Sequence, residues 1–191
     1  MIVRTMLYLR DLPKYEAIEQ RARRYPEIDP AAVVSYLVLL RVASDVLAAI
    51  ETYLARHDMS QGRFTVLALL NRNPDEPMCP SDLATRSGVT RATMTGLLDG
   101  LEREKLVRRE PDQKDRRMLL VELTPRGRKM LDGIFPDYYR RIAKMMGHLS
   151  EAQKKTLIEL LNQVTPGLSA MTDPPEANGK HNGPKREEGR T

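Results

Sequence analysis

The chain has 191 residues, of which 41% are hydrophobic and 30% charged, a balance typical of an ordinary soluble protein. Lys and Arg number 31 against 26 Asp and Glu, and the net charge of +5 fits a polyanionic partner without requiring one. A single cysteine, Cys79, excludes an intrachain disulfide and a multi-cysteine zinc site. The sequence contains no HExxH, Gly-rich phosphate loop or G-x-S-x-G motif, so we expect no enzyme, no cofactor and no metal.

Membrane segments and targeting signals are not expected either. No run of residues approaches the roughly 18 apolar positions that a membrane helix needs. The N-terminus is a poor signal peptide because Arg4, Arg10 and Asp11 interrupt its apolar stretch. We therefore expect a cytoplasmic protein with no membrane partner.

The N-terminal part of the chain is predicted to be helical. Apolar residues recur at helical spacing over 11–25, and we expect this short helix to contribute to a dimer interface, the alternative being a mobile appendage. Asp29 and Pro30 are an N-cap and a first-turn proline for a long helix that runs to about Arg56. Apolar residues cover more than one face of this helix, which predicts burial on several sides. A homodimer interface explains that burial, and a larger single core is the alternative.

A helix-turn-helix pattern occupies the middle of the chain. A short helix is predicted at 81–85, followed by a tight turn at Ser87 and Gly88. A second helix begins at the N-cap Thr90 and runs to about Glu104. Two helices joined by a tight glycine turn are typical of DNA-binding proteins.

Residues 106–123 predict a β-hairpin directly after this pattern. A polar, charge-dense turn precedes the apolar strand 118–123, and Thr124 and Pro125 then form the N-cap and first position of another helix. A basic tip on a narrow projection can enter a DNA minor groove, where negative potential concentrates. We therefore interpret the hairpin as the wing of a winged DNA-binding domain. The expected fold class is mainly α with a small β-hairpin (α+β).

The C-terminal part is predicted to hold two helices and a tail. Pro136 lies inside the first helix and should kink it, while Ser150 and Gln153 form a capping box for the second. Beyond Pro166 the chain is rich in Pro, Gly, Asn and charges, which is typical of disorder. The chain thus divides into an N-terminal extension (1–28), a dimerisation helix (29–59), a DNA-binding lobe (60–123), C-terminal dimerisation helices (124–165) and a disordered tail (166–191).

Residues 30–165 resemble the MarR family of winged helix-turn-helix transcription regulators. The family's wing pattern is Asp-x-Arg, five residues, Leu-Thr and a glycine three positions after the threonine, which occurs here as Asp115, Arg117, Leu123, Thr124 and Gly127. The resemblance implies an obligate homodimer whose terminal helices interlock and which binds a pseudo-palindromic site in double-stranded DNA. It also implies a repressor that a small aromatic or anionic effector relieves.

The candidate DNA contacts lie in the helix-turn-helix and the wing. We assign this role to Ser81, Arg86, Thr90, Arg91, Thr93, Thr95, Lys114, Asp115, Arg116 and Arg117. Arg117 matches the family's minor-groove arginine, and Asp115 is placed to orient its guanidinium by a charge-assisted pair. The alternative is a surface salt bridge of little energetic value. Lys114 and Arg116 are expected to be phosphate contacts or solvated charges, and Thr90 is first of all an N-cap.

Three positions depart from the family pattern. Gly96 and Gly100 stand where the family often carries larger polar residues, so we expect readout to shift toward the wing and DNA shape. For Gly96, close approach of the backbone to DNA or to a helix and a simple lack of function are the alternatives. Lys105 replaces the glycine usual between recognition helix and wing. A left-handed residue at that corner would cost a non-glycine side chain about 1 kcal/mol.

The effector site is the least determined part of the sequence. His57, Met59 and Arg63 are candidates because they offer a cation for a carboxylate and soft apolar walls, although local packing or capping also explains them. Cys79 precedes a helix, and helix N-termini favour reactive thiolates, so a redox-responsive regulator is an alternative function. A winged-helix module that only binds proteins is another.

Overall fold

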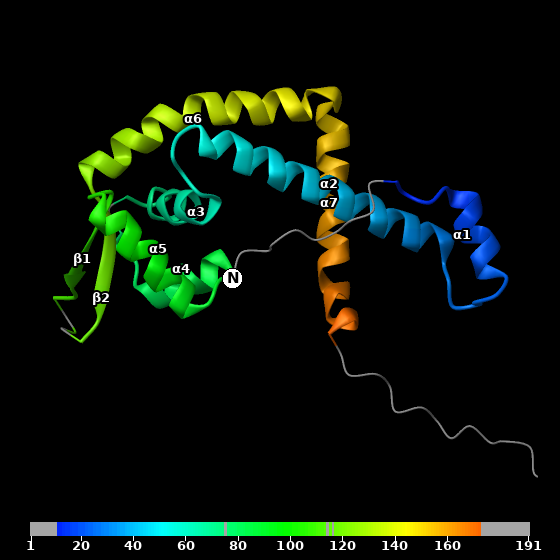
Figure 1. The fold of residues 1–191 in the computed structure, drawn as a ribbon, viewed down its shortest axis with the longest axis horizontal. Coiled ribbons are helices and arrows are strands. Elements are labelled where there is room, and N and C mark those ends of the chain that lie inside the picture. The colour runs from blue at the N-terminus through cyan, green and yellow to red at the C-terminus, as the bar shows by residue number, and fades with distance from the viewer. Residues whose placement is uncertain (1–10, 75, 114, 116, 173–191) are drawn as a thin grey trace, which may run out of the picture. The chain divides into compact units, whose positions relative to one another are not determined.

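The computed structural model describes residues 11–74, 76–113, 115 and 117–172. The chain divides into two compact units, Met1–Pro136 and Asp137–Thr191. The described residues form seven α-helices, one two-stranded antiparallel sheet and two 3₁₀ segments (Figure 1): α1 Tyr15–Ala22, α2 Pro30–Ala55, α3 Gln61–Leu70, α4 Pro80–Ser87, α5 Arg91–Arg103, β1 Val107–Pro111, β2 Leu119–Leu123, α6 Pro125–Met145, a 3₁₀ turn Met146–His148, α7 Glu151–Val164 and a 3₁₀ segment Thr165–Met171. The predicted mainly helical fold with one hairpin is confirmed.

The first two helices begin and pack as their sequences suggest. The Asp29 carboxylate accepts the N–H groups of Ala31 (2.9 Å) and Ala32 (3.1 Å), which caps α2, and Pro30 occupies its first position. α1 packs against α2 and buries Ile18, whose exposed fraction is 3%. The N-terminal extension therefore has an apolar contact with the long helix.

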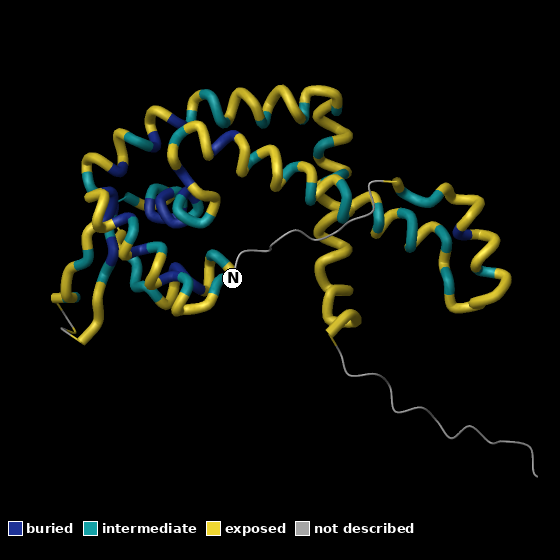
Figure 2. Tube along the Cα trace, in the orientation of Figure 1, coloured by how far each residue is buried: buried dark blue, intermediate teal, exposed yellow. Residues whose placement is uncertain are grey.

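α2 leaves much of its apolar surface uncovered by its own unit. Tyr36, Val42 and Leu47 are 49%, 55% and 46% exposed. In Figure 2 most of α2 has the colours of exposed and intermediate residues. By length and composition this helix could cross a membrane, so the expectation that no segment is apolar enough was wrong. Alanines and serines interrupt the run of large apolar residues but scarcely lower its average apolarity, and Arg41 and Asp45 pair with each other at 2.7 Å.

The core of the first unit lies where α3, α4, α5 and the hairpin meet (Figure 2, dark blue). Apolar side chains at helical spacing on three helices meet alternating residues of two strands, which is the packing that these periodicities dictate. The side chains with less than 2% exposure are Leu54, Val66, Leu67, Leu83, Met94, Leu98, Leu101, Leu106, Val107, Val121 and Leu131. This core holds the helix-turn-helix and the base of the wing in one body.

Thr124 and Gly127 join the wing to α6. Thr124 Oγ1 accepts the N–H of Gly127 (3.0 Å) as an N-cap and donates to the carbonyl of Lys105 (2.7 Å). The backbone N–H of Thr124 donates to the carbonyl of Leu106 (3.1 Å). A Cβ at Gly127 would overlap that same Leu106 carbonyl oxygen and lie 3.3 Å from Leu123 Cγ. The glycine of the family pattern is therefore required by a close backbone approach.

Lys105 adopts a left-handed conformation, with φ of 61°, between α5 and β1. The corner thus has the turn usual for a glycine although a lysine occupies it. Two backbone hydrogen bonds hold this conformation. The N–H of Lys105 donates to Glu102 O (2.8 Å), and the N–H of Leu106 donates to Leu101 O (2.9 Å). The non-glycine cost of about 1 kcal/mol is tolerated there.

The second unit contains the rest of α6 and α7. Pro136 lies inside α6 without ending that helix, and the Ser150–Gln153 capping box begins α7 as predicted. Thr165–Met171 forms a 3₁₀ segment, so the first part of the expected disordered tail is helical, because Pro166 fits a first helical turn. Residues 173–191 of that tail lie outside the described residues.

We expect Gly127→Ala to lower the free energy of unfolding by about 1–3 kcal/mol, because a Cβ cannot fit against the Leu106 carbonyl. Gly133→Ala is a matched control in the same helix, where no atom lies within 4 Å of an added Cβ. It should instead raise stability by up to about 1 kcal/mol through helix propensity. Urea titrations at one protein concentration would measure both, and equal effects would contradict the close-contact argument.

Lys105→Gly should raise the free energy of unfolding by about 1 kcal/mol, because glycine adopts a positive φ without steric cost. Lys105→Ala keeps the left-handed cost and removes only the charged side chain. Thermal melts of the two variants separate backbone strain from side-chain effects. A gain with alanine equal to that with glycine would argue against strain.

Candidate nucleic-acid interface

The two helices of the helix-turn-helix are set by their caps. Gly88 ends α4 in a left-handed conformation with φ of 65°, and its N–H closes the turn onto Thr85 O (3.2 Å). α5 then begins at Arg91, where Thr90 Oγ1 accepts the N–H of Thr93 (3.2 Å). The predicted glycine turn and the predicted N-cap of the recognition helix are both present. α4 is longer than the predicted 81–85.

The start of α5 exposes its polar face. Arg91, Ala92, Thr95 and Gly96 are exposed and Thr93 is half-buried. Thr95 Oγ1 donates to the carbonyl of Arg91 (3.0 Å), while the hydroxyls of Thr90 and Thr93 share a hydrogen bond of 2.9 Å. A phosphate oxygen can only accept, so Thr95, whose hydroxyl proton is used internally, must break that bond to donate to DNA, and so must whichever of Thr90 and Thr93 is the donor in their shared bond. Arg91 has the most direct access to an exterior partner.

The two glycines of α5 do not make room for a neighbouring part of this unit. No atom lies within 4 Å of a Cβ built on Gly96 or Gly100. The expectation that Gly96 allows close approach to a helix is therefore wrong among the described residues. Its exposed backbone leaves close approach to DNA and a simple lack of function as the remaining alternatives.

The wing is a short hairpin with a fixed register. Val107 pairs with Leu123, and the register runs out to Pro111 opposite Leu119. At the turn, Asp115 Oδ1 accepts the backbone N–H of Arg117 at 3.0 Å.

The expected Asp115–Arg117 guanidinium pair is thus replaced by a backbone contact, since the short aspartate side chain reaches the N–H two residues on. Arg117 itself is exposed. Asp115 shapes the turn that carries the Arg117 side chain. The candidate contacts Lys114 and Arg116 lie outside the described residues.

Arg109 ties the wing to the recognition helix. Its Nη2 lies 2.6 Å from Asp99 Oδ1 and its Nε 3.6 Å from Glu102 Oε2, both on α5. The Arg109 side chain is 20% exposed and stands opposite the buried Val121, so it points inward. Sequence reasoning missed this contact. The signal was present in the alternation of β1, which puts Arg109 on the same face as the buried Val107.

Positive charge on the wing is unevenly compensated. Arg108 contacts Glu122 (2.6 Å) and Glu110 (3.3 Å), and the Glu122 hydrogen bond, then the Glu110 charge, raise the pKa of Arg108. The base of the hairpin therefore holds its positive charge against two carboxylates. Arg117 forms no ion pair with Asp115, the acidic group nearest to it in the sequence.

The effector candidates each have a local partner. Arg63 forms an ion pair with Glu104 at the C-cap of α5, and its Nε is buried without a hydrogen bond. His57 lies against the ring of Tyr53 at 5.1 Å, and Met59 is 3% exposed. The described contacts include no hydrogen bond or ion pair among His57, Met59 and Arg63. Local packing accounts for each of the three.

Ser81 and Arg86 are exposed on α4, as a DNA contact requires. Cys79 is half-buried and its Sγ lies 2.9 Å from Ser81 Oγ. Arg86 also lines a small pocket with Arg72 and Asp82. The candidate DNA contacts on α4 are therefore accessible. The redox role of Cys79 stays a prediction.

Together, the hairpin, the recognition helix and the core that joins them define a winged helix-turn-helix protein. Comparison with known proteins specifies the class. The sequence model of the MarR family matches residues 57–118. The HTH-type transcriptional repressor YetL of Bacillus subtilis (strain 168) is 34% identical over 165 residues, which are 86% of this chain and 99% of that protein. The chain belongs to the MarR family, as the wing motif indicated.

Solved structures share this architecture. The transcriptional regulator PA4135 is 27% identical with a TM-score of 0.60, covering 69% of this chain and 95% of its own. Staphylococcus aureus MepR, solved in a complex with DNA, is 20% identical with a TM-score of 0.63, covering 70% and 95%. The latter likeness establishes the fold alone. The protein is thus a DNA-binding transcriptional regulator of the MarR type and not an enzyme.

Arg109→Gln should lower the free energy of unfolding by about 1–3 kcal/mol, because it leaves Asp99 and Glu102 without their half-buried cation. Amide hydrogen exchange should also speed up in β1 and β2. Arg108→Gln, one residue earlier and 58% exposed, is the matched control and should leave both measurements unchanged. Similar effects of the two variants would show that Arg109 does not hold the wing.

Proposed function

We propose that this regulator is a homodimeric repressor that binds a pseudo-palindromic operator through two recognition helices and two wings. The observation that carries the proposal is the exposure of Arg91 and Arg117 on two elements fixed to one core. The relative YetL is named a repressor, which supports repression over activation. A cytoplasmic location follows from a chromosomal DNA target.

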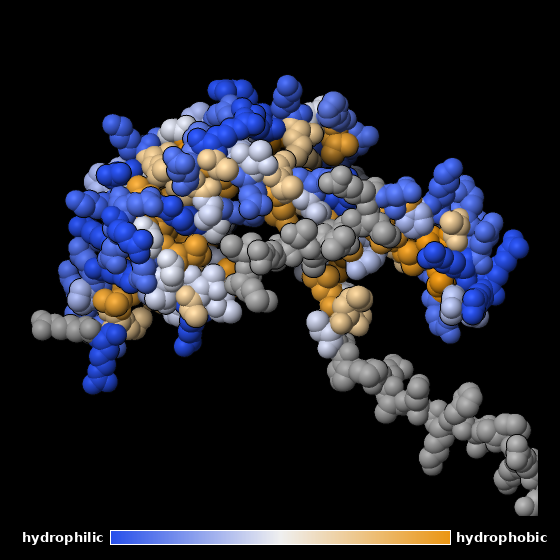
Figure 3. All heavy atoms as spheres, viewed as in Figure 1, coloured by the Kyte–Doolittle hydropathy of each residue, from blue (hydrophilic) through white to orange (hydrophobic). Residues whose placement is uncertain are grey.

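Uncovered apolar surface supports the homodimer. α2 exposes Tyr36, Val42 and Leu47, and α7 exposes Ile158 and Leu160 at 59% and 54%. Figure 3 shows hydrophobic surface in orange. Exposed apolar surface of this extent marks interfaces. A second protomer on these helices would bury it, and two-fold symmetry would then set half-sites about one helical turn apart. A homodimer interface would also explain the apolarity of α2 without a membrane.

The DNA contacts divide by chemistry. Arg91 at the start of α5 would read a guanine edge or hold a phosphate, and Thr93 and Thr95 would contact phosphates or a thymine methyl. Arg117 would enter the minor groove, in a turn that Asp115 shapes. Phosphate contacts from the first helix and the caps would position the lobe: Ser81, Arg86 and Thr90. We extend the phosphate role to Lys114 and Arg116 at the wing turn.

A small aromatic or anionic effector would act through Arg63. An effector carboxylate that binds this guanidinium must compete with Glu104, which forms the C-cap of the recognition helix. Releasing Glu104 would loosen the end of α5 beside the left-handed corner. His57 and Met59 would supply an aromatic edge and a soft apolar wall.

Arg117→Ala should weaken binding to the operator by about 1–3 kcal/mol and reduce the salt slope of binding by about one. Arg103→Ala removes another exposed arginine, from the C-terminal end of α5, and should have little effect. Fluorescence anisotropy at several salt concentrations, on a duplex that the wild-type protein selects from a random library, would measure both. Wild-type affinity in Arg117→Ala would refute the assigned role.

The same selection separates a regulator from a winged helix that only binds proteins. A regulator enriches one sequence, footprints the DNA upstream of its own gene and shows steep salt dependence. Repeating the footprint with a panel of aromatic acids tests the effector. A wild-type protein that enriches no sequence would favour the protein-interaction alternative.

A further inference from the structure

We propose that Met118, supported by Leu119, makes an apolar contact with the deoxyribose walls of the minor groove beside Arg117, so that the wing binds DNA by apolar contact as well as by charge. This inference rests on the proposed binding of the wing to DNA. It adds to the wing a contact whose strength does not depend on salt.

The apolar pair lies beyond the reach of the core. Met118 and Leu119 are 43% and 46% exposed, whereas Val121 and Leu123, on the same strand as Leu119, are buried. Leu119 shares the face of those buried residues but stands past the edge of the core, and Met118 lies directly before the strand, next to Leu119. Figure 3 shows an apolar patch among hydrophilic side chains at this hairpin. Folding of the protomer therefore does not explain two large apolar residues here.

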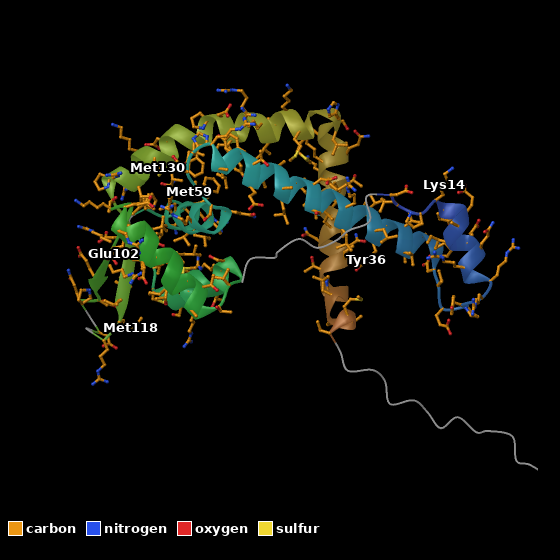
Figure 4. The ribbon with its side chains drawn as sticks, viewed as in Figure 1. Lys14, Tyr36, Met59, Glu102, Met118 and Met130 are labelled. Atoms are coloured by element: carbon orange, nitrogen blue, oxygen red, sulfur yellow. The ribbon has the colours of Figure 1, made fainter. Side chains whose placement is uncertain are left out.

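The backbone presents Met118 in a fixed position. Its N–H donates to Asp115 O (2.9 Å) and its carbonyl accepts the N–H of Asp112 (2.9 Å). Figure 4 places the labelled Met118 near the tip of the hairpin, directly after the exposed Arg117. A side chain on a backbone held from both sides loses less entropy on binding than one on a loose loop.

Charge around the patch selects DNA as the partner. Arg117 is exposed beside Met118, and the chain carries a net charge of +5. The minor groove combines negative potential with apolar sugar walls, and proteins place Met and Leu side chains against or between its steps. A second copy that met this patch with its own wing would bring two exposed Arg117 side chains together. A second protomer would have to overcome that repulsion.

The test compares a polar and an apolar replacement of equal size. Met118→Gln should weaken binding to the selected duplex about fivefold, because it loses the burial of roughly half a methionine side chain. The slope of affinity against salt should stay at the wild-type value, since no phosphate contact is lost. Met118→Leu, which stays apolar, should keep the wild-type affinity. Leu119→Thr, which keeps strand propensity, should weaken binding in the same salt-independent way.

Each other outcome overturns the inference in its own way. Wild-type affinity in Met118→Gln means that the side chain does not contact DNA. A reduced salt slope in that variant means that it acts by displacing Arg117. If Met118→Gln sediments differently from wild type in the absence of DNA, the patch contacts a second copy of the chain instead. Wild-type protein that binds no duplex specifically would refute the proposed function itself, and Arg117→Ala would then have no effect to compare.

Discussion

The close approach of α6 to the carbonyl of Leu106 is the constraint on which the DNA-reading surface depends. It joins the end of the recognition helix, the first strand of the wing and the start of α6 at one point. Thr124 closes this point with its hydroxyl, and Gly127 permits it by lacking a side chain. Because three elements meet there, an error at this junction would displace the wing from the helix that it accompanies.

Two arginines extend this rigidity along the recognition helix. Arg109 connects α5 to the wing, and Arg63 connects the C-cap of α5 to α3. Both guanidinium groups are paired with carboxylates at or near the end of α5 and are largely buried, so we interpret both as positioning residues. Carboxylates on a DNA-binding helix repel the phosphates of DNA. The ion pairs of Asp99 with Arg109 and of Glu104 with Arg63 reduce that repulsion. Asp99 and Glu104 thus stabilise the lobe through ion pairs that also neutralise their own charge.

The sequence predicted the elements that depend on local rules. Asp29, Thr90 and Ser150 cap helices as expected because capping acts over three residues, and the wing motif predicted the hairpin and its anchor. Contacts between distant residues were not predictable in the same way. The Arg109–Asp99 pair needs the angle between strand and helix, and the backbone contact of Asp115 needs the turn geometry. The apolarity of α2 was underestimated because polar residues such as Arg41 and Asp45 interrupt its apolar run while its average hydropathy stays high.

The uncovered face of α2 has a consequence for how such a regulator responds to its own abundance. If only a second protomer covers this helix, the isolated protomer carries an apolar surface that chaperones, proteases and aggregation would act on. Operator occupancy would then rise more steeply than linearly with the amount of protein made. A modest change in synthesis could switch the regulated genes without any effector.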